Sequence, residues 1–250
     1  MNDFLRQKAQ SGRGEKKVII SILTMFPELF GDFFKAPVIA RQIRAGRLSV
    51  RLLDIKSYAP GSFRRIDDSP YGGGAGMILR CQPVVDALRS ALAGTDAGRE
   101  RTRVIALDPA GRPFTQAMAR AYMGLEHLIL VCGHYEGMDA RIYDYVDEVV
   151  SIGDYVLTGG ELPAMVLCDA VVRLTDGALR AESTREESFE EGMLEYPQYT
   201  RPAVFEGKAV PEVLLSGDHG AIESWRRQAA RERTERMRPD LIHQRGEMGE

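Results

Sequence analysis

Short apolar runs that are typical of β-strands alternate with helical segments between residues 103 and 174. The expected strands cover residues 103–107, 127–132 and 148–152, and the helices that alternate with them cover residues 115–122, 139–146 and 161–174. Parallel strands need a crossover connection of a dozen or more residues, which is usually a helix. The alternation therefore predicts an α/β fold, with a mostly parallel sheet that carries helices on both faces.

The preceding part of the chain adds to the same fold. Further strands are expected at residues 18–25 and 48–55, and further helices at residues 28–35, 38–45 and 83–92. Residues 57–77 are rich in Gly, Pro, Ser and Asp, and we expect a long loop there. A loop of that length inside a compact domain is usually functional or mobile.

The composition changes sharply after residue 179. Residues 181–191 are charged and nearly free of large apolar side chains, as is typical of a flexible linker. Apolar residues then return, and Ser216 and Asp218 offer caps for a last helix that runs to about residue 236. The expected parts are a polar extension at 1–17, a ligand-binding α/β domain at 18–179, a linker at 180–190 and a small helical domain at 191–250.

The last expected helix is basic. Residues 225–238 contain six Arg and two Glu, a local excess of four positive charges in a chain whose net charge is -3. Such a stripe on a separate small domain suits a nucleic-acid backbone, because binding to phosphates is largely electrostatic. A solvated helix face with Glu/Arg pairs is the alternative interpretation.

Glycines or a proline follow three successive expected strands, at the ends where parallel sheets bind ligands. The segment 151–165 is interrupted at Gly153 and again by a glycine pair, and glycine lets a backbone approach a ligand because it has no Cβ. In the segment 133–141, Tyr135 could stack on a flat ring and Glu136 could accept hydrogen bonds. The alternative there is an ordinary helix start capped by Asp139. Together with residues 107–109, these segments predict one shared pocket.

The loop at residues 70–77, PYGGGAGM, has four glycines in five residues. It lacks the GK[ST] ending of a Walker A loop and the spacing of a GxGxxG dinucleotide turn. Two interpretations stay open: a flexible turn, or a loop that packs tightly against a ligand or a partner backbone.

The cysteines and histidines argue against several classes of site. Cys81, Cys132 and Cys168 lie far apart among apolar neighbours, so we expect reduced thiols of a cytoplasmic protein. The histidines form no metal motif such as HExxH, and we expect no metal site. No apolar run approaches the roughly 18 to 20 residues of a membrane span, and the N-terminus lacks a signal-peptide core.

Charged residues supply candidates for chemistry. Arg173 lies near the end of a nearly all-apolar helix, where it could stabilise negative charge on a substrate. Its neighbour Asp169, four residues earlier, fits a buried ion pair better than a catalytic role. Glu186 and Glu187 lie in the linker, where acidic residues are usually only solvated. A carboxylate that swings into a closed site would instead act as a general base.

Four motifs, PYGGGAGM, GHYEGMDAR, SIGDYVLTGGELPAM and YPQYTRP, occur in this order. With them the chain resembles the bacterial tRNA (guanine-N1)-methyltransferase family from about residue 18 to about residue 238. That family methylates the guanosine at position 37 of tRNA, next to the anticodon. The resemblance implies a deep trefoil knot in the α/β domain, a homodimer with its sites at the interface, S-adenosylmethionine bound in the knot, and a C-terminal domain that grips the tRNA.

The resemblance also assigns residues by motif. It places the methyl donor on Leu107, Pro109, Gly133, Tyr135, Glu136, Ile152, Gly153, Asp154, Tyr155, Val156, Leu157, Gly159, Gly160 and Pro163. The candidates for contact with tRNA are Asp67, Tyr71, Gly76, Ser188, His219, Arg226 and Arg227. The family is helped by magnesium, but the sequence shows no ligand cluster for it.

The catalytic pair that the resemblance implies is Arg173 and Glu187. Glu187 stands where the family has an aspartate, because the family's E-D-S-F run reads Glu-Glu-Ser-Phe here. Glutamate and aspartate have similar reference pKa values, and a flexible linker can retreat by one carbon–carbon bond. We therefore expect Glu187 to take the proton from guanine N1 while Arg173 stabilises the charge that moves onto O6.

Three alternatives remain at this stage. A knotted methyltransferase could act on another RNA position, such as a ribose hydroxyl. A catalytically silent RNA-binding protein is the second alternative, because the aspartate is replaced. A dinucleotide oxidoreductase is disfavoured, because no strand ends in GxGxxG.

Overall fold

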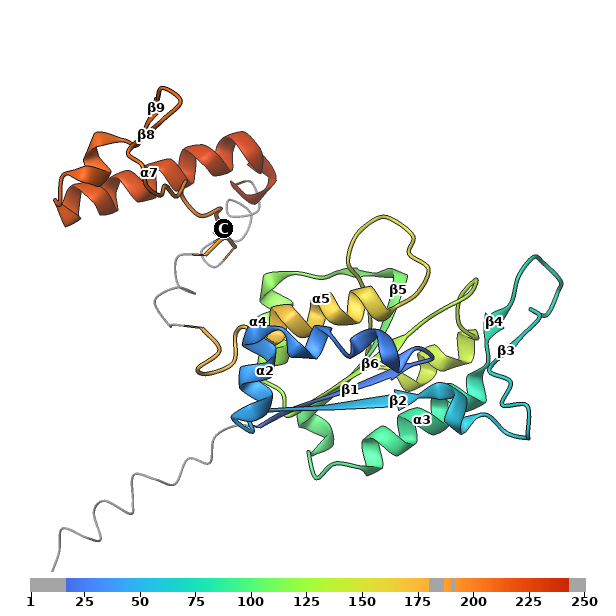
Figure 1. Cartoon of the computed structure of the whole chain (residues 1–250). Helices are drawn as coiled ribbons and strands as arrows, with labels where there is room; N and C mark the ends of the chain where they lie inside the picture. The colour runs from blue at the N-terminus through green and yellow to red at the C-terminus, as the bar shows by residue number, and fades with distance from the viewer. Residues whose placement is uncertain (1–16, 180–186, 190–191, 243–250) are drawn as a thin grey trace, which may run out of the picture. The chain divides into compact units, whose positions relative to one another are not determined.

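The computed structural model of the chain describes residues 17–179, 187–189 and 192–242 (Figure 1). The polar extension expected at residues 1–17 and the linker expected at 180–190 therefore lie largely outside the described residues. The chain divides into two compact units between Leu179 and Arg180.

The first unit is built on a five-stranded sheet with the order β2-β1-β6-β5-β7. Its strands are β1 (Val18–Thr24), β2 (Leu48–Asp54), β5 (Thr102–Pro113), β6 (His127–Cys132) and β7 (Glu148–Ser151). All four neighbouring pairs are parallel, with Leu23 opposite Val131 and Leu107 opposite Cys132. The carboxyl ends of the central strands therefore lie side by side, and the predicted α/β class with a mostly parallel sheet is confirmed.

Helices cover both faces of this sheet. Figure 1 shows α2 (Pro37–Arg44), α4 (Gln116–Met123) and α5 (Glu161–Val172) together on one face and α3 (Cys81–Ala93) on the other. Alternate residues of the strands enter two separate cores: Leu128 and Leu130 face α5, whereas Ile129 and Val131 face α3. This period of two, on strands that are apolar throughout, is the expected result when both faces of a parallel sheet are covered.

Two helices expected from the sequence are 3₁₀ turns instead. The helix expected at 28–35 is wrong: the segment forms the turns η1 (Pro27–Phe30) and η2 (Phe33–Lys35), because Phe30 is drawn into the core and Gly31 separates the turns. The segment 139–146 forms one 3₁₀ turn, η5 (Ala140–Tyr145), which the Asp139 side chain caps at Arg141 N. Such short connectors commonly adopt the tighter helix.

The segment expected as a long loop, residues 57–77, is partly ordered. It follows the turn η3 (Ile55–Tyr58), and its middle strand β3 (Asp67–Asp68) pairs antiparallel with β4 (Ile78–Leu79). Ile66, next to β3, is buried. The loop is therefore confirmed over most of its length, and only the pairing of Asp67–Asp68 was missed, because one buried isoleucine and a two-residue pairing are too short to form a recognisable pattern.

β5 is more than twice as long as the strand expected at 103–107, and it meets β7 twice. Leu107 and Arg112 both lie opposite Val150, with a register shift between them. At the second meeting, Gly111 touches the backbone of β7: a Cβ on Gly111 would lie 2.4 Å from Val150 N. The close approach requires glycine, since real Cβ atoms do not come this near to a backbone atom.

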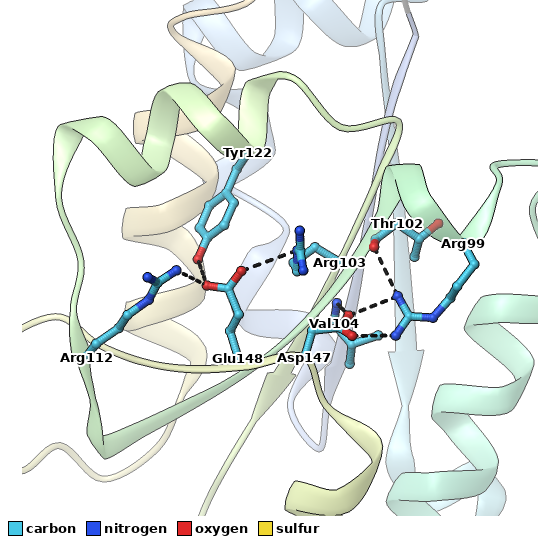
Figure 2. A network of polar contacts seen from close by, with 8 residues as sticks. All are labelled: Arg99, Thr102, Arg103, Val104, Arg112, Tyr122, Asp147 and Glu148. Atoms are coloured by element: carbon cyan, nitrogen blue, oxygen red, sulfur yellow. Dashed lines mark hydrogen bonds and ion pairs between the residues drawn. The ribbon is translucent and has the colours of Figure 1, made fainter.

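A polar network holds this edge of the sheet together (Figure 2). Glu148 accepts hydrogen bonds from Arg112 and from the Tyr122 hydroxyl (2.8 Å), and Arg103 forms an ion pair with it at 3.3 Å. Burial and the bond to Glu148 raise the pKa of Tyr122. The next residue, Asp147, binds Arg99 and accepts from Val104 N at 2.8 Å. The network thus links β5, β7 and α4 near the first residue of β7.

His127 makes folding sensitive to pH. Its imidazole is fully buried, and its Nε2 lies 2.8 Å from the Ser21 hydroxyl. Burial, and then the positive charge of Arg51, lower its pKa from 6.5 to about 4. As the pH falls, the unfolded chain therefore takes up a proton before the folded chain does. The contribution of His127 to stability is complete above pH 6.5 and is lost between pH 6.5 and about 4.

We expect this histidine to account for about 2 kcal/mol of the stability lost between about pH 7.5 and about pH 5. Urea unfolding of the wild type and of His127→Gln at both pH values measures this loss. The free energy of unfolding of His127→Gln should fall by about 2 kcal/mol less than that of the wild type over this pH range. The free energy of unfolding of His219→Gln, a change at an exposed position, should fall as much as that of the wild type. Equal losses in the wild type and His127→Gln would show that His127 does not set the pH dependence.

The second unit centres on one long helix, α7 (His219–Met237), whose first turn is capped by Asp218 accepting from Ala221 N at 3.0 Å. It also contains the hairpin of β8 (Val204–Phe205) and β9 (Lys208–Ala209) and the turn η6 (Glu212–Leu215). The buried Thr234 hydroxyl donates to Ala230 O and accepts from Leu194 N, which anchors the incoming chain to the helix. No helix among the described residues of either unit is long and apolar enough to cross a membrane.

Candidate active site

A cavity of about 410 Å³ lies beside residues 107–110 of β5 and at the carboxyl ends of β6 and β7. We call it the strand-end cavity. It is lined by Leu107, Asp108, Pro109, Ala110, Gly133, His134, Tyr135, Glu136, Gly137, Val150, Ser151, Ile152, Gly153, Tyr155, Val156, Leu157, Thr158, Gly159, Gly160 and Pro163. The three segments that follow the expected strands thus share one cavity, in the place where α/β sheets bind ligands.

The glycine pair before α5 lets this helix start against the end of β6. Gly160 N–H donates to Gly133 O at 2.8 Å, and Gly159 forms an isolated bridge with His134. A Cβ on Gly160 would lie 2.7 Å from the Cys132 Cα and 2.9 Å from the Gly133 N. Two backbones therefore touch along this wall of the cavity, which leaves no room for a side chain at position 160.

The opposite wall is the loop after β7. Gly153 has a φ of 151°, which side-chain-bearing residues rarely adopt, and the Ser151 hydroxyl bonds the backbone on both sides of it. The Tyr155 hydroxyl donates to Ile152 O at 3.3 Å and folds the ring back over the turn. Val156, by contrast, is largely exposed at the rim. The loop is thus held by its own contacts while presenting backbone and apolar side chains to the cavity.

Asp108 orders the part of β5 between its two meetings with β7. Its carboxylate accepts from Ala110 N at 2.8 Å and from the Tyr143 hydroxyl at 2.6 Å. Burial and this bond raise the pKa of Tyr143, so the hydroxyl keeps its proton. Asp108 therefore fixes the turn that carries Leu107 and Pro109 into the cavity.

The glycine-rich loop packs against one end of the cavity. Glu136 N–H donates to Met77 O at 3.0 Å, and a Cβ on Gly76 would lie 2.4 Å from the Glu136 Cγ. Gly72 and Gly73 have nothing within 4 Å of where a Cβ would be, and Tyr71 is fully exposed. One glycine of the motif is thus needed for a close contact within this unit, while the tip of the loop reaches into open space.

Asp67 lies near the same end. Burial raises the pKa of the Tyr135 hydroxyl, and the negative charge of Asp67 raises it further. Tyr135 itself has a φ of 63°, so its backbone is held in the left-handed region. The pairing of Ile78 with Tyr135 supports this conformation. Asp67, Gly76 and Glu136 thus lie around one end of the cavity although 60 to 69 residues separate the first two from the third.

Of the residues that the sequence assigned to a methyl donor, all except Asp154 line the strand-end cavity; Asp154 is exposed beside it. Sequence reasoning passed over His134, Thr158, Gly137 and Ser151 as lining residues, although each lies inside a motif that it had singled out. His134 and Thr158 each lie between two assigned residues, and Gly137 and Ser151 each lie next to one, and this adjacency is the signal that would have found them.

Arg173 and Glu187 are not among the residues that line the cavity. Arg173 ends α5, and its N–H bonds Asp169 O at 3.0 Å. Glu187 belongs to the second unit, next to Ser188, whose hydroxyl accepts from Glu195 N at 3.0 Å. Each of these residues is described only within its own unit.

The residues predicted to contact tRNA are divided between the units. Asp67, Tyr71 and Gly76 belong to the first, and Ser188, His219, Arg226 and Arg227 to the second. His219 is the first residue of α7, and the Arg226 guanidinium lies 4.7 Å from the centre of the Tyr196 ring. Arg227 lies 3.9 Å from Glu223, and both side chains are exposed. Some Glu/Arg pairs do form along α7, as the alternative interpretation of this helix required.

Among the residues that the structure describes, no group of three or more His, Cys, Asp or Glu side chains is arranged to hold a metal ion. The cavity instead offers backbone groups, apolar side chains and the rim carboxylate of Glu136, which is a set suited to a small organic ligand.

Comparison with known proteins gives one consistent result. The family model described as tRNA (Guanine-1)-methyltransferase TrmD matches residues 18–244. A tRNA (guanine-N(1)-)-methyltransferase of Moorella thermoacetica is 52% identical over 225 residues, which cover 89% of each chain. Proteins of the same name are 52% identical in Heliobacterium modesticaldum, over 89% of this chain and 84% of the relative, and 50% identical in Desulforudis audaxviator, over 90% of both.

Proposed function

Because the chain belongs to the tRNA (guanine-1)-methyltransferase family, we propose that it transfers a methyl group from S-adenosylmethionine to N1 of the guanine at position 37 of tRNA. The observation that carries the proposal is the strand-end cavity, two of whose walls come from the motifs GHYEGMDAR and SIGDYVLTGGELPAM, by which the chain resembles the family. Since the substrate is tRNA, we expect the enzyme to act in the cytoplasm.

The strand-end cavity suits the donor in size and chemistry. Its volume of about 410 Å³ lies within the range of small-molecule sites. Leu107, Ile152 and Leu157 give it apolar walls for a flat ring, and the glycines expose backbone groups that can bind the edge of that ring. Glu136, at the rim, can accept hydrogen bonds from ribose hydroxyls. The donor supplies an electrophilic methyl group, so no metal is needed for that step.

The reaction requires a base, because guanine N1 carries a proton. We assign this role to Glu187: its carboxylate takes the N1 proton as the N1 lone pair forms a bond to the methyl carbon. The bond from that carbon to sulfur breaks at the same time, and its electron pair stays on sulfur. Negative charge moves onto guanine O6 during proton removal, and we assign its stabilisation to Arg173.

A homodimer is part of the proposal. α5 is apolar nearly all round, yet Leu162 is 58% exposed and Val166, one turn later, is 45% exposed. An apolar stripe of this kind is usually covered by another surface. We propose that a second copy covers it and that residues of both copies complete each active site.

The proposal also includes a knot in the first unit and tRNA binding by the second unit. The second meeting of β5 with β7, past Gly111, supports a chain that is threaded at this edge of the sheet. In the second unit, the arginines of α7 support a surface for the phosphates of the tRNA. A knot and a tRNA-binding unit are the simplest account of these two observations.

Transcripts of one tRNA with guanosine or adenosine at position 37, incubated with labelled methyl donor, test this function. We expect label in N1-methylguanosine from the first transcript and none from the second. Label that persists in the second transcript would identify a methyltransferase for another position. Binding of donor and tRNA without label in either would identify a silent RNA-binding protein.

A further inference from the structure

A buried carboxylate lies directly behind the glycine wall of the strand-end cavity. Glu161, the first residue of α5, is only 5% exposed. Its Oε1 accepts a hydrogen bond of 2.7 Å from the Thr24 hydroxyl, which itself accepts from Phe26 N. Sequence reasoning gave Glu161 no role, because a glutamate in the first helical turn is common and is explained by the helix dipole alone.

The other oxygen of Glu161 points toward the cavity wall. A Cβ on Gly159 would lie 2.4 Å from Glu161 Oε2 and 2.5 Å from His134 Nδ1. Gly159 and His134 both line the cavity, whereas Glu161 does not. The carboxylate is thus separated from the cavity by a residue without a side chain.

No cation among the described residues neutralises this carboxylate. The Thr24 hydroxyl that donates to it is neutral, and none of the ion pairs of the described residues includes it. His134 Nδ1, which faces the same point, has no hydrogen-bond partner within the described part of the chain. Burying an uncompensated charge is costly, so a function for that charge is worth seeking.

The negative charge of Glu161 also affects a neighbouring thiol, that of Cys132. The pKa of the buried Cys132 thiol, at the end of β6, is raised by burial first and then by the negative charge of Glu161. Glu161 and Cys132 are both buried, so little solvent screens the charge behind this wall of the cavity. In such surroundings, a unit charge acts over several ångströms with a strength well above its value in water.

We propose that Glu161 makes the strand-end cavity prefer the cationic methyl donor over the neutral product of the reaction. This inference rests on the proposed function, in which the cavity binds S-adenosylmethionine. The sulfonium of that donor carries a positive charge, which S-adenosylhomocysteine lacks after the methyl group has left. The two ligands are otherwise nearly identical, so a fixed negative charge behind the wall discriminates between them and favours release of product.

The test compares two affinities in two proteins. Calorimetric titration of wild type and Glu161→Gln with S-adenosylmethionine and with S-adenosylhomocysteine gives the ratio of their dissociation constants. We expect Glu161→Gln to weaken donor binding by about tenfold and product binding by less than about twofold. Glu126→Gln, which removes the same charge at the opposite end of β6, should leave the ratio unchanged.

The outcomes separate the possible roles of Glu161. Equal weakening of both ligands would assign it a structural role, or a contact with the amino group that both ligands carry, and would overturn the inference. An unchanged ratio would overturn it too. If wild type binds neither ligand, it is the proposed function that fails. If wild type binds both and only the shift in ratio is missing, the proposed function stands without this inference.

A second pair of measurements covers the case in which Glu161→Gln does not fold. Glu161→Asp keeps the charge and should keep the preference for the donor. Sinefungin, an analogue with a protonatable amine in place of the sulfonium, should bind wild type more tightly than S-adenosylhomocysteine does. Tighter binding of the neutral product than of sinefungin, or loss of the preference in a folded Glu161→Asp, would contradict the proposal.

Discussion

Replacing Glu187 with glutamine should lower the kcat of methylation by about 10²- to 10⁴-fold, the usual contribution of a general base. Glutamine has nearly the same shape as glutamate and can make hydrogen bonds, but it cannot take the proton from guanine N1 at neutral pH. Single-turnover assays with saturating donor and tRNA measure this effect, because they report the chemical step without product release.

The binding constants provide the control for this variant. Glu187→Gln should bind donor and tRNA as the wild type does, since the carboxylate acts only when the proton leaves. Glu187→Asp, which restores the residue found in the family motif, should retain most of the activity. If Glu187→Gln turns over at the wild-type rate, another group is the base. If Glu187→Asp is as inactive as Glu187→Gln, the linker does not adjust by one carbon–carbon bond as we expect.

Gly160→Ala should lower kcat/KM for S-adenosylmethionine by on the order of 100-fold, because a displacement of about 1 Å in a reactive site has this effect. The new methyl group would lie 2.7 Å from the Cys132 Cα and 2.9 Å from the Gly133 N. Both are backbone atoms of the β6 end, so they cannot move aside as a flexible side chain would. The start of α5 must shift instead, and with it the wall of the cavity.

Calorimetric titration with the donor and thermal unfolding together measure the effect of Gly160→Ala. We expect weaker donor binding and a loss of stability of about 1 to 3 kcal/mol, the usual cost of overpacking. Gly31→Ala is the matched control, because its Cβ would meet only Glu28 O at 3.5 Å, an ordinary contact. Wild-type donor affinity in Gly160→Ala would show that the close approach of α5 to β6 does not shape the cavity.

Elements with a strong local pattern were predicted well, and elements without one were not. The strands 127–132 and 48–55 agree with β6 and β2 to within one residue, because runs of β-branched and apolar residues report directly on burial in a sheet. The helix expected at 28–35 failed, because its aromatic residues satisfied a helical pattern while Phe30 was needed in the core. Burial of a single large side chain outweighed a weak helical preference.

The candidate site was likewise predicted only in part from the sequence. Glycines after two of the expected strands and a proline after the third marked the three walls of the strand-end cavity, because a glycine in such a place signals a close approach of backbones. The sequence could not say what each glycine approaches. Gly76 meets the Glu136 side chain, Gly160 meets the end of β6, and Gly72 and Gly73 meet nothing. The environment of Glu161 was likewise invisible, since Thr24, its partner, lies 137 residues away.

The amino-acid sequence by itself determined that this chain forms a parallel sheet between helices, and at which glycine-containing strand ends the chain lines a cavity. Only the tertiary structure decided the strand order β2-β1-β6-β5-β7, the return of β5 to Val150 past Gly111, and the seat of a carboxylate behind the cavity. The physical reason is that periodicity and glycine record the local preferences of neighbouring residues. The order of the strands and the burial of the Glu161 carboxylate depend instead on contacts between segments far apart in the chain. No local sequence pattern records which of these segments become neighbours.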